Sequence, residues 1–408
     1  MTAAPLPSYS RTRSWRPLTE SMRVAFLSCV LFAAIGCGAG SKGVEYGRWD
    51  GTARMAAGSG MRVRWSKLLV EEFGGAYVPV ERAGAALDPL HGLLYIGSTQ
   101  GKLWAFSDDG KPQYTFSTGS SIEAPPTLDE RRDELYVASS SGLLHGLRAH
   151  DGKVRFTAEL GAPVSQPGLL SDDALYLVTD ADGVYALSRA DGSVLWRYQR
   201  DARAGLKVSG HAGLLSSGQR IVTGFSDGSI VALDKSDGHV VWTVDTTLDF
   251  ADPSQSEQGF VDVDTTPVQV GDTIYAASFL AGFYGLNSQD GVVRFRAAEF
   301  TGITSIAADE RAIVLASADR GVVCYDLPTL SPRWLRHEAL RGSPNQVEVY
   351  DRAVYVTESR GAFLALALSD GHEIGRIQAE HGFTAAPSLR QGQGFILGNS
   401  GILYAFEY

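Results

Sequence analysis

Three features of the sequence predict an all-β fold made of repeated four-stranded sheets. A glycine that follows a short apolar strand recurs through the chain. An Asp-Gly pair comes eight or nine residues after most of these glycines, and an aromatic residue lies five residues beyond the aspartate. Each feature marks a boundary or a contact between β-strands, because Gly and Asp-Gly favour tight turns and aromatic side chains fill the space between sheets.

The recurring glycine defines eight units. Its successive separations are 41, 41, 45, 54, 39, 40 and 40 residues, so one period of about 40 residues with a single long insertion covers the chain from residue 62 onward. The eight positions are Gly101, Gly142, Gly183, Gly228, Gly282, Gly321, Gly361 and Gly401.

The Asp-Gly pair and its aromatic partner divide each unit further. The pair occurs at 109, 151, 191, 237, 290 and 370, and the aromatic residues are Tyr114, Phe156, Trp196, Trp242 and Phe295. The sixth unit keeps the spacing with Trp334 although it has lost the Asp-Gly pair. We expect these rings to pack between neighbouring sheets and not to bind a ligand.

Each unit is therefore predicted to contain a strand, a Gly turn, a second strand, an Asp-Gly turn, an aromatic strand and a looser fourth strand. Eight such sheets form either a radial array or an open solenoid, and the chain ends favour the array. The last unit stops after its Gly401 strand, whereas residues 62–65 supply an aromatic strand with no Gly strand before it. The sequence predicts an eight-bladed β-propeller in which the N-terminal strand closes the last blade and removes the exposed edges.

The N-terminal residues predict a targeting signal followed by a flexible tether. Residues 1–36, with several arginines before the apolar run 24–35, are expected to form a signal peptide, since 12 apolar or small residues are too few to span a bilayer. Met22 is the favoured translation start. Residues 34–37, Ala-Ile-Gly-Cys, resemble a lipobox, which implies lipidation of Cys37; an ordinary signal peptide with an incidental cysteine is the alternative. Residues 37–60 are expected to be a flexible tether and 61–408 the propeller.

Charge and cysteine content argue against a nucleic-acid-binding protein and against a disulfide-stabilised fold. The net charge of −10 has the wrong sign for a nucleic-acid partner. Cys324 is the one cysteine within the predicted propeller, where we expect a buried apolar role and no disulfide.

No constellation for catalysis or metal binding stands out. The eight histidines are scattered singly. Residues 180–183, Asp-Ala-Asp-Gly, resemble the start of a calcium loop, but the downstream Glu is missing and the segment falls on the Gly turn, so a turn is expected. The sequence thus predicts neither an enzyme nor a bound cofactor.

The repeat from 62 to 408 resembles that of pyrroloquinoline-quinone-type propellers, which include both enzymes and binding proteins. With the lipobox and the closing strand, the chain resembles the BamB family of outer-membrane assembly lipoproteins, and Val261–Pro267 (VDVDTTP) is similar to a segment of that family. The resemblance implies a lipid-anchored, non-catalytic scaffold at the outer membrane, facing the periplasm. Its implied partners are the periplasmic domains of the barrel assembly subunit and unfolded outer-membrane proteins.

The same resemblance implies the partner-binding residues. Asp262 and Asp264 match two acids of the family's segment, just after the insertion 246–260; the alternative is that they cap the turn into the following Thr-Thr-Pro. Leu206, Val208 and Ser209 match a second loop with the pattern Leu-x-Leu-Arg, with Ser209 in place of the arginine.

Two other functions stay open on the sequence alone. One is a quinoprotein-like enzyme or ligand-binding propeller that holds pyrroloquinoline quinone and Ca²⁺ in its channel, although this chain has no adjacent Cys-Cys pair. The other is a surface propeller for adhesion or sensing.

Overall fold

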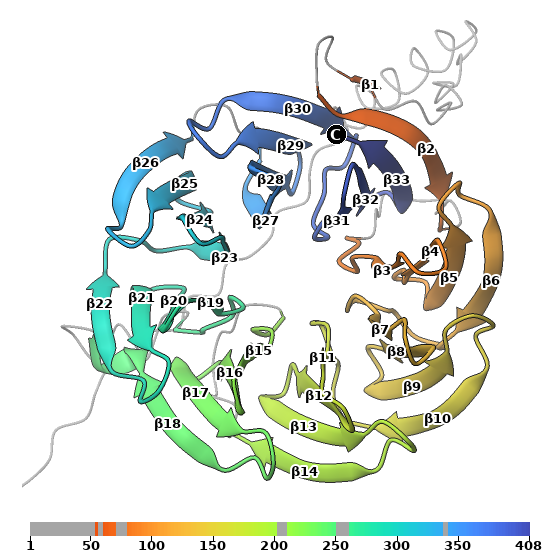
Figure 1. Cartoon of the computed structure of the whole chain (residues 1–408), viewed down its shortest axis with the longest axis horizontal. Coiled ribbons are helices and arrows are strands. Elements are labelled where there is room, and N and C mark those ends of the chain that lie inside the picture. Colours follow the sequence, from red (N-terminus) through yellow and green to blue (C-terminus); the bar gives the residue numbers. More distant parts are fainter. Residues whose placement is uncertain (1–53, 56–59, 71–79, 202–209, 250–260, 338–341) are drawn as a thin grey trace, which may run out of the picture. The chain divides into compact units, whose positions relative to one another are not determined.

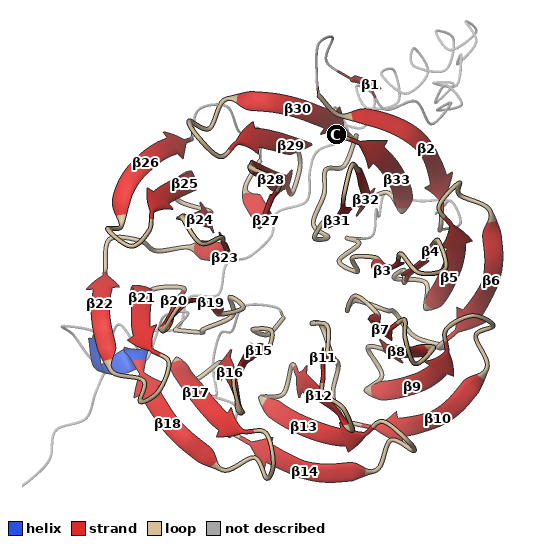
Figure 2. Ribbon diagram, viewed as in Figure 1, coloured by secondary structure: helices blue, strands red, loops and turns tan. Residues whose placement is uncertain are grey.

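The computed structural model describes residues 54–55, 60–70, 80–201, 210–249, 261–337 and 342–408. They belong to one compact unit, Gly51–Tyr408, in which eight antiparallel sheets stand around a common axis (Figure 1). The regular structure of these residues consists of strands and one short 3₁₀ helix, joined by loops and turns (Figure 2). The predicted eight-bladed β-propeller is confirmed. Cys37 and the predicted signal peptide lie outside the described residues.

Blades 1 to 4 each contain four strands, in order from the axis outward. They are β3 (Ala86–Asp88), β4 (Leu93–Ile96), β5 (Lys102–Ser107) and β6 (Pro112–Ser117); β7 (Thr127–Asp129), β8 (Glu134–Ala138), β9 (Leu143–Arg148) and β10 (Val154–Glu159); β11 (Leu169–Leu170), β12 (Ala174–Thr179), β13 (Gly183–Ser188) and β14 (Val194–Gln199); and β15 (Leu215–Ser217), β16 (Arg220–Gly224), β17 (Ser229–Asp234) and β18 (Val240–Asp245), followed by the 3₁₀ helix η1 (Thr246–Asp249).

Blades 5 to 8 repeat this order, with one added strand and one strand from the other end of the chain. They are β19 (Val268–Val270), β20 (Thr273–Ser278), β21 (Gly282–Asn287) and β22 (Val293–Ala297); β23 (Ile303–Ala308), β24 (Ala312–Ser317), β25 (Gly321–Asp326) and β26 (Ser331–Arg336); β27 (Pro344–Tyr350), β28 (Ala353–Glu358), β29 (Ala362–Ala367) and β30 (Glu373–Gln378) with β1 (Arg54–Met55) on its outer edge; and β31 (Ser388–Arg390), β32 (Gln393–Leu397), β33 (Ile402–Glu407) and β2 (Arg62–Leu68).

The N-terminal strand closes the ring, as predicted. β2 pairs antiparallel with β33, with Trp65 opposite Ala405. An ion pair between Arg62 and Glu407, with Nη2 and Oε2 2.6 Å apart, lies at one end of this pairing. Blade 8 therefore takes its outer strand from the beginning of the propeller and its other three strands from the end.

The looser strand of each unit belongs to a different blade from the one predicted. We expected it to complete the sheet of the aromatic strand before it, but it opens the next blade as the innermost strand, as when Thr127 of β7 pairs with Tyr136 of β8. The reason is geometric: the chain must return from the outer rim to the axis before it starts a new sheet. Several of the inner strands have only two or three residues, so their side chains carry little pattern.

The repeated aromatic residues pack between blades, which confirms their predicted role. The Trp196 ring fills the space beside Gly238 of the next blade, where an added Cβ would lie 2.5 Å from Trp196 Cε3. The indole Nε1 also donates a 2.9 Å hydrogen bond to the Lys235 carbonyl. The same ring-on-glycine contact recurs for Trp65 and Gly110, Tyr114 and Gly152, Phe156 and Gly192, Trp242 and Gly291, and Trp334 and Gly371.

Cys324 is a buried member of the core between blades 6 and 7, as expected, and burial raises the pKa of its thiol to about 11. Within the described part of the chain, none of the helical structure has the length and apolar character of a membrane span.

Candidate functional site

The two faces of the propeller carry different connections. Because the strands alternate in direction, the turns between second and third strands share one face with the connections between blades, which we call the Gly-turn face. The other two turns of each blade form the Asp-Gly face. Two long connections, 200–214 between blades 3 and 4 and 246–267 between blades 4 and 5, are neighbours on the Gly-turn face and account for the 45- and 54-residue spacings.

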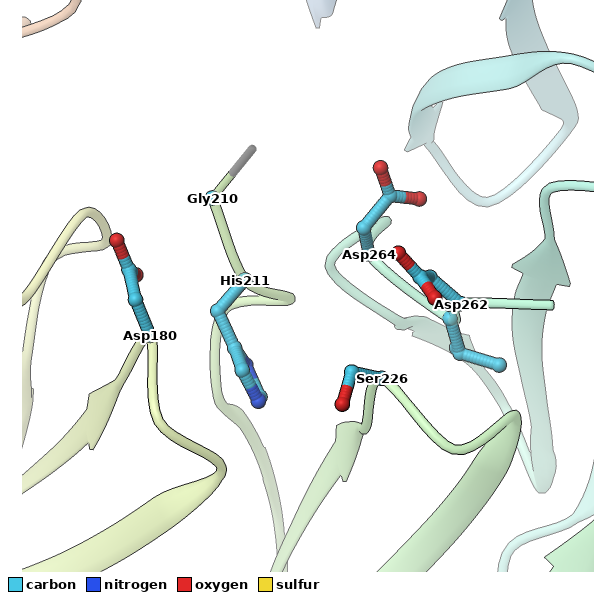
Figure 3. A pocket seen from close by; sticks show the side chains of 7 residues that line it. Asp180, Gly210, His211, Ser226, Asp262 and Asp264 are labelled. Carbon is cyan, nitrogen blue, oxygen red and sulfur yellow. The ribbon is translucent and has the colours of Figure 1, made fainter. Parts of the chain in front are cut away.

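A pocket lies on this face where blades 3, 4 and 5 meet (Figure 3). Asp262 and Asp264 come from one loop on one side of the pocket, Asp180 stands on the opposite side, and His211 and Ser226 lie between them. Gly210 and Val263 complete the lining. The structure thus brings the two acids predicted from the sequence next to the end of the second predicted loop.

Asp262 and Asp264 differ in their accessibility. Asp262 is 3% exposed, and its carbonyl accepts a 2.9 Å hydrogen bond from the Phe279 amide. Asp264 is partly buried. Burial raises the pKa of Asp264 to about 7, and the nearby Asp262 charge acts in the same direction, against a backbone hydrogen bond that lowers it. As a whole residue Asp264 is the more exposed of the two, although its Oδ1 atom is buried.

A close approach fixes the loop that carries both acids. The Val263 amide donates a 3.1 Å hydrogen bond to the Phe225 carbonyl of blade 4. A Cβ on Gly224 would lie 2.2 Å from the Val263 carbonyl oxygen, so only glycine leaves room for the backbone at this place. The local sequence Thr-Gly-Phe at the end of β16 therefore sets how near the acidic loop comes to blade 4.

A second group, Asp182 and His211, was not predicted from the sequence. His211 Nε2 lies 3.2 Å from Asp182 Oδ1, and the Ser226 amide donates to the same oxygen at 2.9 Å. Burial opposes ionisation of Asp182, but the hydrogen bonds from His211 and Ser226 outweigh it and hold the pKa of Asp182 below its usual value. The turn expected at residues 180–183 is present, and Asp182 has a positive φ of 59°.

Leu206, Val208 and Ser209 fall between described residues 201 and 210, and nothing is assigned to their side chains.

One group on the Asp-Gly face has side chains near enough to share a metal ion. Asp234, Asp237 and His239 lie at the turn between β17 and β18 of blade 4. Asp234 accepts a hydrogen bond from the Ser236 amide at 2.8 Å, and Asp237 accepts one from the His239 amide at 3.0 Å. The two carboxylates thus already accept hydrogen bonds within the turn, and we assign no function to this group.

Fold and repeats together define an eight-bladed propeller of the pyrroloquinoline-quinone repeat class. A family model described as "Outer membrane protein assembly factor BamB" matches residues 131–336, about half of the chain. The chain belongs to this family.

Individual relatives support the assignment at modest identity. BamB of Shewanella oneidensis is 23% identical over 274 residues, which are 67% of this chain and 68% of that protein. BamB of Escherichia coli K12 is 22% identical over 321 residues, covering 66% of this chain and 81% of that protein.

Solved structures agree on the fold. BamB from Moraxella catarrhalis superposes with a TM-score of 0.72 at 21% identity, covering 85% of this chain and all of that one. The quinohemoprotein alcohol dehydrogenase from Comamonas testosteroni has a TM-score of 0.65 at 11% identity, covering 86% and 76%. At these identities the likenesses establish the architecture alone.

Proposed function

We propose that this chain is a lipid-anchored, non-catalytic scaffold of the outer-membrane β-barrel assembly machinery. In this proposal the Gly-turn face of blades 3 to 5 docks the periplasmic domains of the barrel subunit. Asp262 and Asp264 contribute the acidic part of the contact, and Leu206, Val208 and Ser209 contribute the neighbouring apolar and polar part.

Val261–Pro267 supports the docking proposal by its position in the fold. This segment, similar to one in the BamB family, ends the longest connection in the chain and puts two carboxyl groups in a pocket between three blades. Long connections gathered on one face of a repeat protein commonly form its binding face. The acidic residues favour a partner group that is cationic, such as a lysine or arginine side chain.

Unfolded outer-membrane proteins are the second proposed partner, and the outer edges of the blades suit them. β1 pairs with β30 as a fifth strand, with Met55 opposite Ile377, so an outer edge of this propeller accepts an added strand. Exposed apolar side chains such as Val154, Val194 and Val240 lie on the outer strands of other blades. An extended, alternating apolar segment would pair with such an edge through its backbone.

Anchoring through Cys37 completes the proposal. A lipidated cysteine after a cleaved signal peptide would hold the propeller at the outer membrane, facing the periplasm, and replacement of Cys37 by serine should release the protein from membranes.

The docking proposal is tested by copurification with the barrel subunit from detergent-solubilised membranes. Because Asp262 is buried, the test uses the neutral double variant D262N/D264N, which keeps the side-chain volumes. We expect recovery of the barrel subunit to fall about tenfold, the effect of one lost charge-assisted contact. The double variant D234N/D237N, on the Asp-Gly face, is the matched control and should copurify normally.

Equal recovery with both double variants would remove the acidic loop from the interface. Pyrroloquinoline quinone with Ca²⁺ should leave the thermal midpoint of the purified protein unchanged; a clear rise would favour the quinoprotein function instead.

A further inference from the structure

We infer that Asp182 is a positioning residue of the proposed docking face, because it ties the connection between blades 3 and 4 to the turn that holds the connection between blades 4 and 5. The consequence for docking rests on the proposed function, whereas the ties themselves are observed hydrogen bonds.

Asp182 is suited to hold several groups at once. Its side chain is 1% exposed, and its carboxylate receives the Ser226 amide, the Ser226 hydroxyl and the His211 ring. A buried carboxylate with several donors makes stronger hydrogen bonds than a neutral group does. Aspartate also tolerates the left-handed backbone conformation that this turn requires.

Both ends of the first connection meet at this residue. The Arg200 amide, at the start of the connection, donates a 3.1 Å hydrogen bond to the Asp182 carbonyl. His211, near its end, lies against the Asp182 carboxylate. The His211 ring is also packed edge-on against Phe225, with centroids 5.5 Å apart. Asp182 thus fixes where the chain leaves blade 3 and where it enters blade 4.

The second connection is tied to the turn that Asp182 holds. The Thr246 amide, at its start, donates a 3.1 Å hydrogen bond to the Gly228 carbonyl, and the Val263 amide, near its end, donates to the Phe225 carbonyl. Ser226 lies in this same turn and is bonded to Asp182 through its amide and hydroxyl. A chain of bonds therefore runs from Asp182 through the blade 4 turn to Val263, which lies between Asp262 and Asp264.

The next blade has an aspartate at the equivalent repeat position, and it strengthens the same arrangement. Asp227 directly precedes Gly228, as Asp182 directly precedes Gly183. Asp227 Oδ2 accepts a 2.7 Å hydrogen bond from Arg200 Nε. Arg200 is therefore held through its backbone by blade 3 and through its side chain by blade 4.

The chain contains a matched control for Asp182. Asp133 in blade 2 also has a positive φ, 57°, and its carboxylate contacts the His150 ring and accepts the His150 amide at 2.8 Å. It lies in the turn between β7 and β8, on the Asp-Gly face, away from the proposed docking residues.

The experiment compares D182A and D182N with D133A and D133N in the full-length protein. Amide hydrogen exchange is measured at residues 211–213 and 261–265, and affinity is measured for the isolated periplasmic domains of the barrel subunit. We expect D182A to speed exchange in both segments and to weaken binding, each by about tenfold, with D182N restoring part of both because it keeps an acceptor oxygen and the allowed backbone. D133A and D133N should change exchange near His150 and leave affinity within about twofold.

The outcomes separate the inference from the function on which it rests. Unchanged exchange at 261–265 in D182A overturns the inference, whatever the affinity. Faster exchange with unchanged affinity also overturns it, because Asp182 would then be structural only. If D262N/D264N binds as well as wild type, the proposed docking function fails; if that variant loses binding while D182A keeps it, the positioning role alone fails.

Discussion

The two faces of the propeller hold their loops in different ways. On the Asp-Gly face one contact is repeated: in six of the eight blades an aromatic residue packs on the turn glycine of the next, as Trp196 does on Gly238. On the Gly-turn face the backbone bonds also recur, as when the Thr118 and Thr246 amides donate to the Gly101 and Gly228 carbonyls, but the side-chain contacts of Asp182 with His211 and Ser226 occur once. The repeated contact therefore builds the ring, whereas the single contacts shape one part of it.

The largest expected effect comes from breaking a repeated contact. Gly238 has a φ of 75°, and its Cβ would meet the Trp196 ring, so G238A should destabilise the fold by about 3 kcal/mol through backbone strain and overpacking together. Denaturant unfolding measures this loss.

Gly218 in the same blade is the control for that substitution. It has a φ of 59° and no heavy atom within 4 Å of an added Cβ, so G218A should lose only about 1 kcal/mol, from strain. Equal losses for the two variants would mean that the ring-on-glycine contact adds nothing to stability.

A substitution on the Gly-turn face should separate stability from binding. In G224A the new Cβ must displace the Val263 backbone, so we expect a loss of about 2 kcal/mol in stability and a roughly tenfold loss of affinity for the barrel subunit's periplasmic domains. Calorimetry and a binding titration on the same samples test both effects.

Gly285 in blade 5 provides the comparison for G224A. Its Cβ would lie 2.0 Å from Phe295 Cε1, so G285A also overpacks the protein, but against a side chain of the blade interior. Affinity should then stay near wild type once the folded fraction is taken into account. An equal loss of affinity in G285A would show that general destabilisation, and not loop position, weakens docking.

The smallest expected effect is a pH dependence on the Gly-turn face. The pKa of Asp264 is about 7 in the folded protein, above its ordinary value of 3.8, because burial disfavours the charged form. The folded protein therefore keeps a proton that the unfolded chain loses, and this stabilisation is lost as pH rises through 7. D264N should become more stable than wild type at pH 8, by roughly 1 to 2 kcal/mol, and not at pH 4.

Glu348, in the inner strand of blade 7, is the control for the pH effect. Desolvation by the surrounding chain raises the pKa of Glu348 to about 7, but its side chain is exposed to solvent, so E348Q should show the same direction of change in thermal midpoint with a smaller size. Binding of the barrel subunit should respond to D264N alone. A pH-independent difference in stability between D264N and wild type would contradict the raised pKa.

The repeated part of the fold could be predicted because each feature occurs many times. Eight turn glycines and six ring-on-glycine contacts reinforce one another, and the unpaired aromatic strand around Trp65 revealed the closure. The inner strands, such as β11 (Leu169–Leu170), were assigned to the wrong blade because a two-residue strand has no alternation that could place it.

The candidate site was only partly predictable. Asp262 and Asp264 were found through a family resemblance that covers one short segment. Asp182 and His211 are 29 residues apart, lie in neighbouring blades and meet only because the ring brings a turn beside a connection. The one available signal was an aspartate before the turn glycine in two consecutive units, at 182 and 227, which also fits an ordinary turn.

Closure of blade 8 has a consequence for the order of events during folding. Arg62 and Glu407, which pair across that blade, are 345 residues apart in the chain. Contacts of such long range form slowly, since nearly the whole chain must be ordered before these contacts contribute stabilising free energy. Until β33 has been synthesised, β2 and the last blade formed each keep an unpaired strand edge. A chaperone that covers these edges would therefore raise the yield of folded protein.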